Sequence, residues 1–119
     1  MSAVLVVDDD EDLAALLDMG LSRHGYAITI ARTCSEAHEV ASQEVFDAVI
    51  TDLSLPDGTG SDMVRSLEPR PRAVVIVSGF EPDSAIGADA RSCADVFLLK
   101  PVDVDTLAQR LGQLLSPVD

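Results

Sequence analysis

The sequence alternates short apolar runs of strand length with segments of helical spacing, five times along the chain. The apolar runs are Val4–Val7, Ala27–Ala31, Ala48–Ile50, Ala73–Val77 and Val96–Leu99. Most of them are nearly continuous and rich in β-branched residues, as in strands that are buried on both faces, whereas Ala27–Ala31 is weaker and suits a sheet edge. Such alternation favours right-handed crossovers and a parallel sheet covered by helices on both faces. We therefore predict a doubly wound α/β fold with five strands in the order 2-1-3-4-5.

The segments between the apolar runs carry helix signals. Leucines recur at helical spacing ahead of Gly25 and predict the first helix. Thr33 and Glu36 form a capping-box pattern at the start of a second helix. Three further helices are expected over Ser61–Leu67, from near Pro82, and from near Asp103 onwards.

The length and composition indicate one compact domain. The chain has 119 residues, and 47% of them are hydrophobic, which is enough for one domain with a single core. It contains no apolar run of membrane-spanning length and no basic-then-apolar leader, so we expect a cytoplasmic protein without membrane insertion. Cys34 and Cys93 show no CxxC spacing, and we expect them to be reduced thiols.

The charge of the chain argues against direct contact with nucleic acid. The net charge is −13, from 21 acidic residues against 8 Lys and Arg. Nucleic-acid binders usually carry a basic face, and this chain also has few aromatic side chains for base stacking. We therefore expect no direct binding of DNA or RNA.

Polar residues follow four of the five predicted strands. Asp8 and Asp9 follow the first strand, Asp52 the third, Ser78 the fourth and Lys100 the fifth. The carboxyl ends of parallel strands meet at one edge of a sheet, and ligands of doubly wound folds bind there, between strands 1 and 3. We therefore expect these side chains to converge.

The residue types at this edge indicate a particular chemistry. Three converging carboxylates call for a hard divalent cation with oxygen ligands, and Mg²⁺ held partly by water fits best. Lys100 adds a positive charge and Ser78 a hydroxyl donor. Together these groups suit the binding of a phosphoryl group and its transfer to a carboxylate.

The other acids near the first strand have a simpler explanation. Asp10, Glu11 and Asp12 fall in the first turn of the first predicted helix, where acidic side chains complement the helix dipole. His24 and His38 are expected at helix ends or surfaces, and we assign neither a catalytic role.

At these motifs the chain resembles the receiver domain of two-component response regulators over essentially its whole length. The matching motifs are Val7-Asp8-Asp9, Asp52 with Leu55-Pro56-Asp57-Gly58-Thr59-Gly60, Ser78-Gly79 and Lys100-Pro101. Each motif is short, but their order and their places after successive strands make the resemblance specific.

The resemblance implies a role for each acid. Asp52 would be the phosphoacceptor, Asp9 would bind Mg²⁺ directly, and Asp8 would bind it through water. The backbone carbonyl of Ser54, two residues beyond the acceptor, would be a further ligand.

The resemblance also implies roles on the last two strands. Ser78, where the family more often has Thr, would bind the phosphoryl oxygens. Lys100 would pair with the acceptor and then with the phosphoryl group, and its bond to Pro101 would be cis. Phe97 occupies the position of the family's switching aromatic, although a parallel strand would bury a Phe in any case.

The function implied is that of a receiver domain with the flavodoxin-like fold over residues 1–119, with no effector domain within the chain. The domain would be a signalling phosphoacceptor and no enzyme in the ordinary sense, although it would take part in its own phosphorylation and dephosphorylation. It would take its phosphoryl group from a sensor histidine kinase or a histidine phosphotransfer protein. Phosphorylation would then change the surface of the fourth helix, fifth strand and fifth helix, and so its affinity for an effector domain or protein.

Two alternatives remain at this point. Asp8-x-Asp10 resembles the opening of haloacid-dehalogenase-type phosphatases, in which Asp8 would form the aspartyl phosphate. However, Asp12 stands where those enzymes have Thr or Val, and the chain leaves little room for a cap domain. The other alternative is a receiver-like module that binds partners without phosphorylation, but such modules usually lack a site group, and none is missing here.

Overall fold

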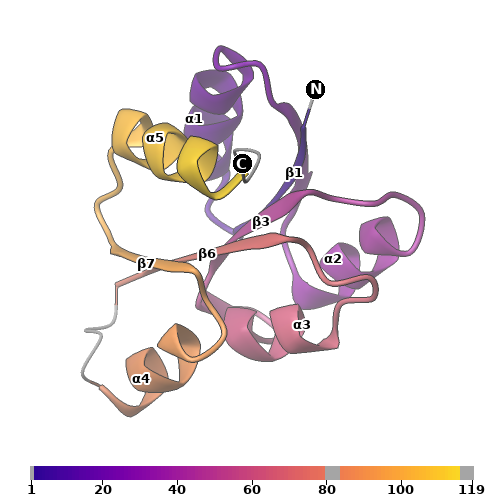
Figure 1. The fold of residues 1–119 in the computed structure, drawn as a ribbon. Coiled ribbons are helices and arrows are strands. Elements are labelled where there is room, and N and C mark those ends of the chain that lie inside the picture. Colours follow the sequence, from indigo (N-terminus) through magenta and orange to yellow (C-terminus); the bar gives the residue numbers. More distant parts are fainter. Residues whose placement is uncertain (1, 80–83, 116–119) are drawn as a thin grey trace.

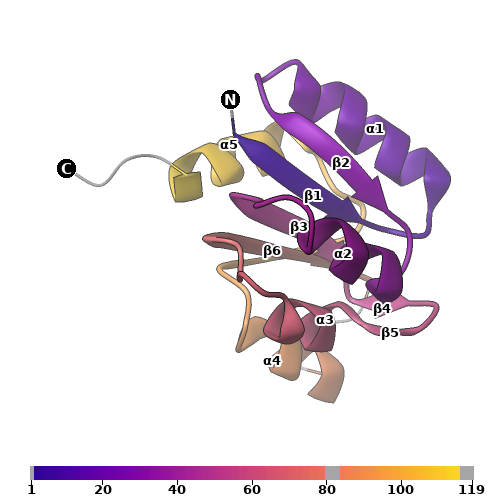
Figure 2. The same cartoon turned by 90° about the vertical axis from the view of Figure 1, so that its right-hand side faces the viewer.

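A five-stranded parallel sheet with helices on both faces forms the protein (Figures 1 and 2). The structure is a computed structural model that describes residues 2–79 and 84–115. The strands of the sheet are β1 (Ala3–Val7), β2 (Ala27–Ala31), β3 (Ala48–Asp52), β6 (Ala73–Ser78) and β7 (Val96–Leu99). Their spatial order is β2-β1-β3-β6-β7, all neighbours pairing in parallel, which confirms the predicted order and the edge position of β2.

Five helices cover the sheet, as the alternation predicted. They are α1 (Glu11–Ser22), α2 (Cys34–Ala41), α3 (Gly60–Ser66), α4 (Ala85–Arg91) and α5 (Val104–Leu115). Figure 1 shows α1 and α5 on one face and α2, α3 and α4 on the other. We call these groups the α1–α5 layer and the α2–α3–α4 layer. Pro82 lies outside the described residues, and α4 begins at Ala85, where the Ser84 hydroxyl accepts a hydrogen bond from the Gly87 amide.

The sheet divides the predicted single core into two buried clusters. Alternate residues of a strand point to opposite faces, so Val4 and Val6 join one cluster while Leu5 and Val7 join the other. The first cluster lies under the α1–α5 layer, and the second lies under the α2–α3–α4 layer. All four of these β1 side chains are fully buried, which explains the continuous apolar run in the sequence.

The helices that follow the first two strands, α1 and α2, both begin with a capping residue. Asp10 is the N-cap of α1, and its carboxylate accepts from the Asp12 and Leu13 amides at 3.1 and 3.2 Å. Thr33 caps α2 by accepting from the Glu36 amide at 3.0 Å. The Glu36 carboxylate accepts from the amide of Arg32, one residue earlier than a capping box requires.

A short antiparallel hairpin after β3 was not predicted. It consists of β4 (Ser54–Leu55) and β5 (Gly58–Thr59) and leads directly into α3. Gly58 in this hairpin has a φ of 156°, which a residue with a side chain rarely adopts. The hairpin is too short to leave an alternating pattern in the sequence, so only its turn residues could have indicated it.

The remaining sequence predictions concern single bonds and residues. The Lys100–Pro101 peptide bond is cis, as expected, and the Glu68–Pro69 bond is cis as well. Cys34 and Cys93 are free thiols. Within residues 2–79 and 84–115, no helix combines the length and the apolar character needed to cross a membrane.

Candidate functional site

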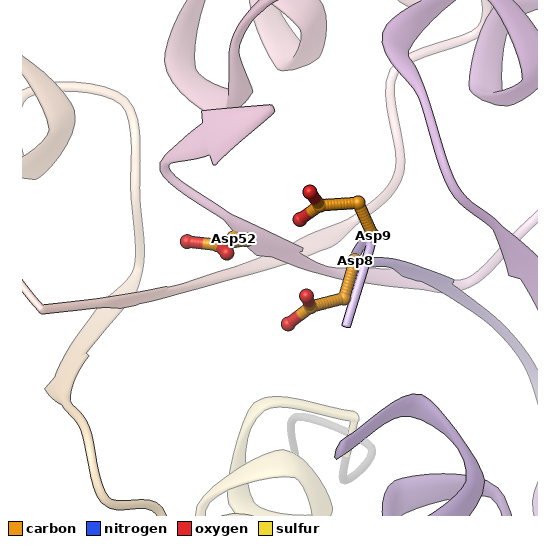
Figure 3. Close-up of side chains that lie close together, drawn as sticks. All are labelled: Asp8, Asp9 and Asp52. Carbon is orange, nitrogen blue, oxygen red and sulfur yellow. The ribbon is translucent and has the colours of Figure 1, made fainter. Parts of the chain in front are cut away.

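Asp8, Asp9 and Asp52 come together where the adjacent strands β1 and β3 end. One carboxylate oxygen of each lies within 4.8 Å of the other two. Figure 3 shows the Asp8 and Asp9 side chains extending from the end of β1 toward the side on which Asp52 lies. The three acids therefore converge as the strand order predicted.

Asp8 is the most buried of the three acids, with 2% of the residue exposed. Its Oδ1 accepts from the Asp10 amide at 2.9 Å, and its own amide donates to the Ala31 carbonyl at 3.0 Å. Burial raises the pKa of Asp8 above its ordinary value of 3.8; the Asp52 charge adds to the rise, and the Asp10 amide and Lys100 oppose it. A negative charge at Asp8 is therefore costly until a cation balances it.

Lys100 joins the acids from the end of β7. Its Nζ donates to Oδ2 of Asp52 at 3.0 Å and lies 3.8 Å from Oδ2 of Asp8. Partial burial of the Lys100 ammonium lowers its pKa, but the hydrogen bond that it donates to Asp52 and the charges of Asp52 and Asp8 outweigh burial, so the pKa of Lys100 is raised. Lys100 is therefore a fixed positive charge at neutral pH, held against the Asp52 carboxylate, whose side chain is only 12% exposed.

Ser54 and Ser78 lie on the backbone segments next to Asp52 and Lys100. The Ser54 amide donates to Oδ1 of Asp52 at 3.3 Å, so the first strand of the hairpin leaves β3 directly beside the Asp52 carboxylate. Ser78 is the last residue of β6 and is fully buried, and its carbonyl accepts from the Lys100 amide at 2.8 Å. The carboxyl ends of β6 and β7 are thus tied together beside Asp52.

Phe97 lies on β7, opposite Ile76 of β6, and packs against the cluster beneath the α2–α3–α4 layer. It is half-buried and lines a surface hollow of about 340 Å³ together with Arg91 and Arg110. Its packing against the core is what burial in a parallel strand predicts, and its role as a switch stays a prediction.

The donor set of this edge fits a hard divalent cation. Asp8, Asp9 and Asp52 supply three carboxylates, whereas Lys100 is the only cation that the described residues place against them. Carboxylate oxygens are the ligands that Mg²⁺ and Ca²⁺ prefer, and Mg²⁺ typically takes one or two carboxylates and keeps several waters. The cluster therefore has the charge and the ligand type for one such ion.

Comparison with known proteins identifies the family. The family model of the response regulator receiver domain matches residues 4–112. The chain belongs to this family. As a receiver domain it is a signalling domain, and neither of the two alternatives from the sequence is favoured.

Relatives with names and structures support this assignment. The receiver domain is 37% identical over 115 residues to the response regulator protein PilR of Pseudomonas aeruginosa, covering 93% of this chain and 25% of PilR. It is also similar to a response regulator from Burkholderia pseudomallei, solved with a phosphorylated aspartic acid, a calcium ion and citrate. That match has a TM-score of 0.82 at 29% identity and covers 98% of this chain and 68% of the other.

A third similar structure is that of TrrA from Thermotoga maritima, in complex with Mg²⁺ and beryllium fluoride. The TM-score is 0.81 at 25% identity, and the match covers 97% of this chain and all of TrrA. Since the receiver domain spans only a quarter of PilR, PilR contains much that this chain does not match.

The sequence did not reveal the contacts of three residues around the site. Thr51 is fully buried, and its hydroxyl donates to the Asp52 carbonyl at 2.9 Å. Asp57 and Gly60 belong to a motif that carries the resemblance, but the sequence assigned them no role, and both make contacts that hold the hairpin. A contact over 23 residues, such as that of Asp57 with Cys34, leaves no local signal in the sequence.

Proposed function

We propose that this receiver domain accepts a phosphoryl group on Asp52, with Mg²⁺ held by Asp8, Asp9, Asp52 and the Ser54 carbonyl. The observation that carries the proposal is the Lys100 ammonium at 3.0 Å from Oδ2 of Asp52, beside three carboxylates within 4.8 Å of one another. The phosphorylated aspartic acid of the B. pseudomallei protein and the Mg²⁺–beryllium fluoride of TrrA give further support. The chain as a whole, residues 1–119, would form this one domain.

The residues of the site would act in an in-line transfer from a phosphohistidine. A carboxylate oxygen of Asp52 attacks phosphorus, a P–O bond forms and the P–N bond breaks, and the electron pair stays on the departing imidazole nitrogen. A bound Mg²⁺ supplies positive charge against the phosphoryl oxygens. Lys100 leaves its hydrogen bond with Asp52 and pairs with a phosphoryl oxygen, and the Ser78 hydroxyl donates to another.

Phosphorylation would be communicated by strands β6 and β7. Ser78 and Lys100 contact the same phosphoryl group from the ends of two paired strands, so its arrival draws both strand ends toward Asp52. Phe97, three residues before Lys100 on β7, would turn inward as this happens. The surface of α4, β7 and α5 would then change its affinity for a partner.

The partners follow from this chemistry. The phosphodonor would be a sensor histidine kinase or a histidine phosphotransfer protein, and the switched surface would bind an effector domain or protein. The acidic chain, with a net charge of −13, does not suit direct contact with nucleic acid. The domain would promote its own phosphorylation and dephosphorylation without acting on a separate substrate.

The geometry also argues against the phosphatase alternative. That mechanism needs Asp10 to face the reacting group, but the Asp10 carboxylate caps α1 through the Asp12 and Leu13 amides. Asp8 is buried, its pKa is raised, and it accepts from the Asp10 amide, so its carboxylate is a weaker candidate nucleophile than that of Asp52.

The direct test uses a small phosphodonor. Wild-type protein incubated with Mg²⁺ and acetyl phosphate should gain one phosphoryl group by mass spectrometry, and the label should be lost in base or hydroxylamine. Asp52→Asn should gain none, because the amide is no nucleophile here, and Asp8→Asn should only be labelled more slowly. Label on Asp8, or full labelling of Asp52→Asn, would overturn the proposal.

The switch has its own readout in the same proteins. Beryllofluoride, which stands in for the phosphoryl group on Asp52, should shift the amide resonances of α4 and β7 in wild type. The shifts around Phe97 should be much smaller in Ser78→Ala and in Lys100→Ala at saturating ligand. Full wild-type shifts in both variants would show that the switch does not pass through these residues.

A further inference from the structure

The β4–β5 hairpin carries Ser54, the residue proposed to supply a backbone ligand, and two contacts hold it from different sides. A backbone ligand cannot adjust by changing a rotamer, so its position depends on the path of the chain around it. That path runs from Asp52 through the hairpin to Gly60, the first residue of α3. The contacts that fix this path belong to side chains and backbone groups outside the proposed ligand set.

The first contact joins the hairpin turn to α2. Asp57 lies between β4 and β5, and its Oδ1 accepts from the Cys34 amide at 2.8 Å while its Oδ2 accepts from the Ser35 amide at 3.1 Å. These are the first two amides of α2, and the next two are satisfied by the Thr33 hydroxyl and the Thr33 carbonyl. One carboxylate thus completes the cap of α2 and at the same time anchors the turn of the hairpin.

The second contact joins the far end of the hairpin to the acceptor strand. The Gly60 amide donates to the Leu53 carbonyl at 2.8 Å. A Cβ on Gly60 would collide with the Asp52 carbonyl oxygen and would lie 2.9 Å from Oγ1 of Thr51, which is fully buried. Because the Asp52 carbonyl is part of the β3 backbone, it cannot move away without moving the backbone of Asp52 itself.

We infer that Asp57 and Gly60 are positioning residues for the Mg²⁺ and phosphoryl site: they fix the β4–β5 hairpin, and thereby the Ser54 carbonyl, relative to Asp52. The inference rests on the proposed function for the ligand role of Ser54. It also gives α2 a part in the proposed function, because Asp57 anchors the turn of the hairpin on the first amides of that helix. The hairpin would hold its geometry only while α2 and α3 both stay docked.

The test measures Mg²⁺ affinity separately from stability. Mg²⁺ is titrated into wild type, Asp57→Asn, Asp57→Ala and Gly60→Ala, with the Ser54 amide resonance as the signal, and each melting temperature is recorded in EDTA. Removing a group that orients a metal ligand typically costs about 10- to 100-fold in affinity. We expect Gly60→Ala and Asp57→Ala to raise the Kd for Mg²⁺ about tenfold, at the low end of that range.

Asp57→Asn should fall between Asp57→Ala and wild type, because its amide oxygen can still accept from one of the two α2 amides. At saturating Mg²⁺ all three variants should still be labelled at Asp52 by acetyl phosphate, since the acceptor itself is intact. A role in folding alone would lower the melting temperature in EDTA and leave the Kd for Mg²⁺ unchanged.

Matched controls are present in the same chain. Asp62 lines the same surface hollow as Asp57, about 220 Å³ in size, but its carboxylate holds no backbone amide among the described contacts, so Asp62→Asn should keep the wild-type Kd. Gly112 lies in α5, where a Cβ would meet only the Tyr26 hydroxyl at an ordinary 3.7 Å, so Gly112→Ala should keep it too.

The outcomes separate this inference from the proposed function. If wild type binds Mg²⁺ and is labelled, and all three hairpin variants keep its Kd within twofold, the positioning role is wrong and the function stands. If wild type neither binds Mg²⁺ nor takes the label, the proposed function fails, and the positioning role fails with it. A tenfold rise in Kd in the hairpin variants, with unchanged controls, supports the inference.

Discussion

The α1–α5 layer and the α2–α3–α4 layer cover opposite faces of one sheet, but their helices are joined in different ways. Between α1 and α5 the contacts are mainly apolar, through the buried Leu17, Leu21, Leu107 and Leu111. The described polar contact in this layer joins Asp105 of α5 to His24, two residues beyond the end of α1, at 4.0 Å, and both side chains are exposed.

The other layer is joined by directional polar bonds. Arg65 of α3 donates to both carboxylate oxygens of Asp89 on α4, at 3.1 Å each, and Ser61 of α3 donates to the same carboxylate. His38 of α2 lies 2.6 Å from the Ser66 hydroxyl of α3. The Asp57 contact adds the hairpin to this set, so polar bonds join the hairpin that follows Asp52 to α2, and join α3 to α4.

The two kinds of contact, apolar and polar, suggest that the two layers contribute differently to the protein. Apolar burial is strong and tolerant of small shifts, whereas a hydrogen bond weakens steeply when its geometry changes. We therefore expect the α1–α5 layer to supply stability, and the α2–α3–α4 layer to respond to the geometry of the proposed phosphoryl site.

The largest effect should follow from a cavity in the α1–α5 layer. Leu21→Ala removes a fully buried side chain and should lower the free energy of unfolding by about 2–5 kcal/mol, measured by urea denaturation. Arg65→Ala should cost clearly less, because the Arg65 side chain is 37% exposed and water replaces part of its bonding. Equal losses in the two variants would mean that the layers do not differ in this way.

A smaller effect should appear at low pH. Hydrogen bonds from the Cys34 and Ser35 amides hold the pKa of Asp57 below its ordinary value of 3.8, and those from Arg65 and Ser61 do the same for Asp89. Each carboxylate therefore stabilises the folded state above its ordinary pKa, and that contribution is lost as the pH falls through the lowered value.

Amide exchange can locate this loss. Compared with about pH 5.5, exchange at about pH 3 should show protection falling first in α2 and α4, while α1 stays protected. Asp57→Asn should weaken α2 protection already at the higher pH and leave less to lose on acidification. If α1 lost its protection from exchange before α2 did, the expected difference between the two layers would be wrong.

The sequence was sufficient to predict the sheet and the convergence of Asp8, Asp9 and Asp52. Strands such as Val4–Val7 are buried on both faces and leave an unbroken apolar run, and a five-stranded doubly wound sheet commonly has the order 2-1-3-4-5. Once the order is known, Asp8, Asp9, Asp52 and Lys100 must meet at one edge, because each follows the end of a strand. This prediction needs only the place of each residue in the sequence relative to the end of its strand.

The polar contacts of the α2–α3–α4 layer could not be predicted in the same way. Arg65 and Asp89 are 24 residues apart, and Asp57 and Cys34 are 23 apart, so their pairing depends on where the helices and the hairpin lie in the fold. Glu36 shows the same limit at short range, since its pattern predicted a bond to the Thr33 amide but its carboxylate binds the Arg32 amide. Patterns of residue type predict elements and edges, and they do not predict which donor meets which acceptor.

The most direct test of the central claim, that the acids after β1 and β3 hold a divalent cation, is the melting temperature with and without Mg²⁺. At ten times its Kd, Mg²⁺ should stabilise wild type by about 1.4 kcal/mol, or about 5 °C for a domain of this size, compared with NaCl of equal ionic strength. Asp12→Ala, which removes an exposed acid of the first turn of α1, should keep that response. Asp9→Ala should lose it, and in EDTA it should be at least as stable as wild type, because the repulsion with Asp8 and Asp52 is relieved. A full Mg²⁺ response in Asp9→Ala would contradict the account.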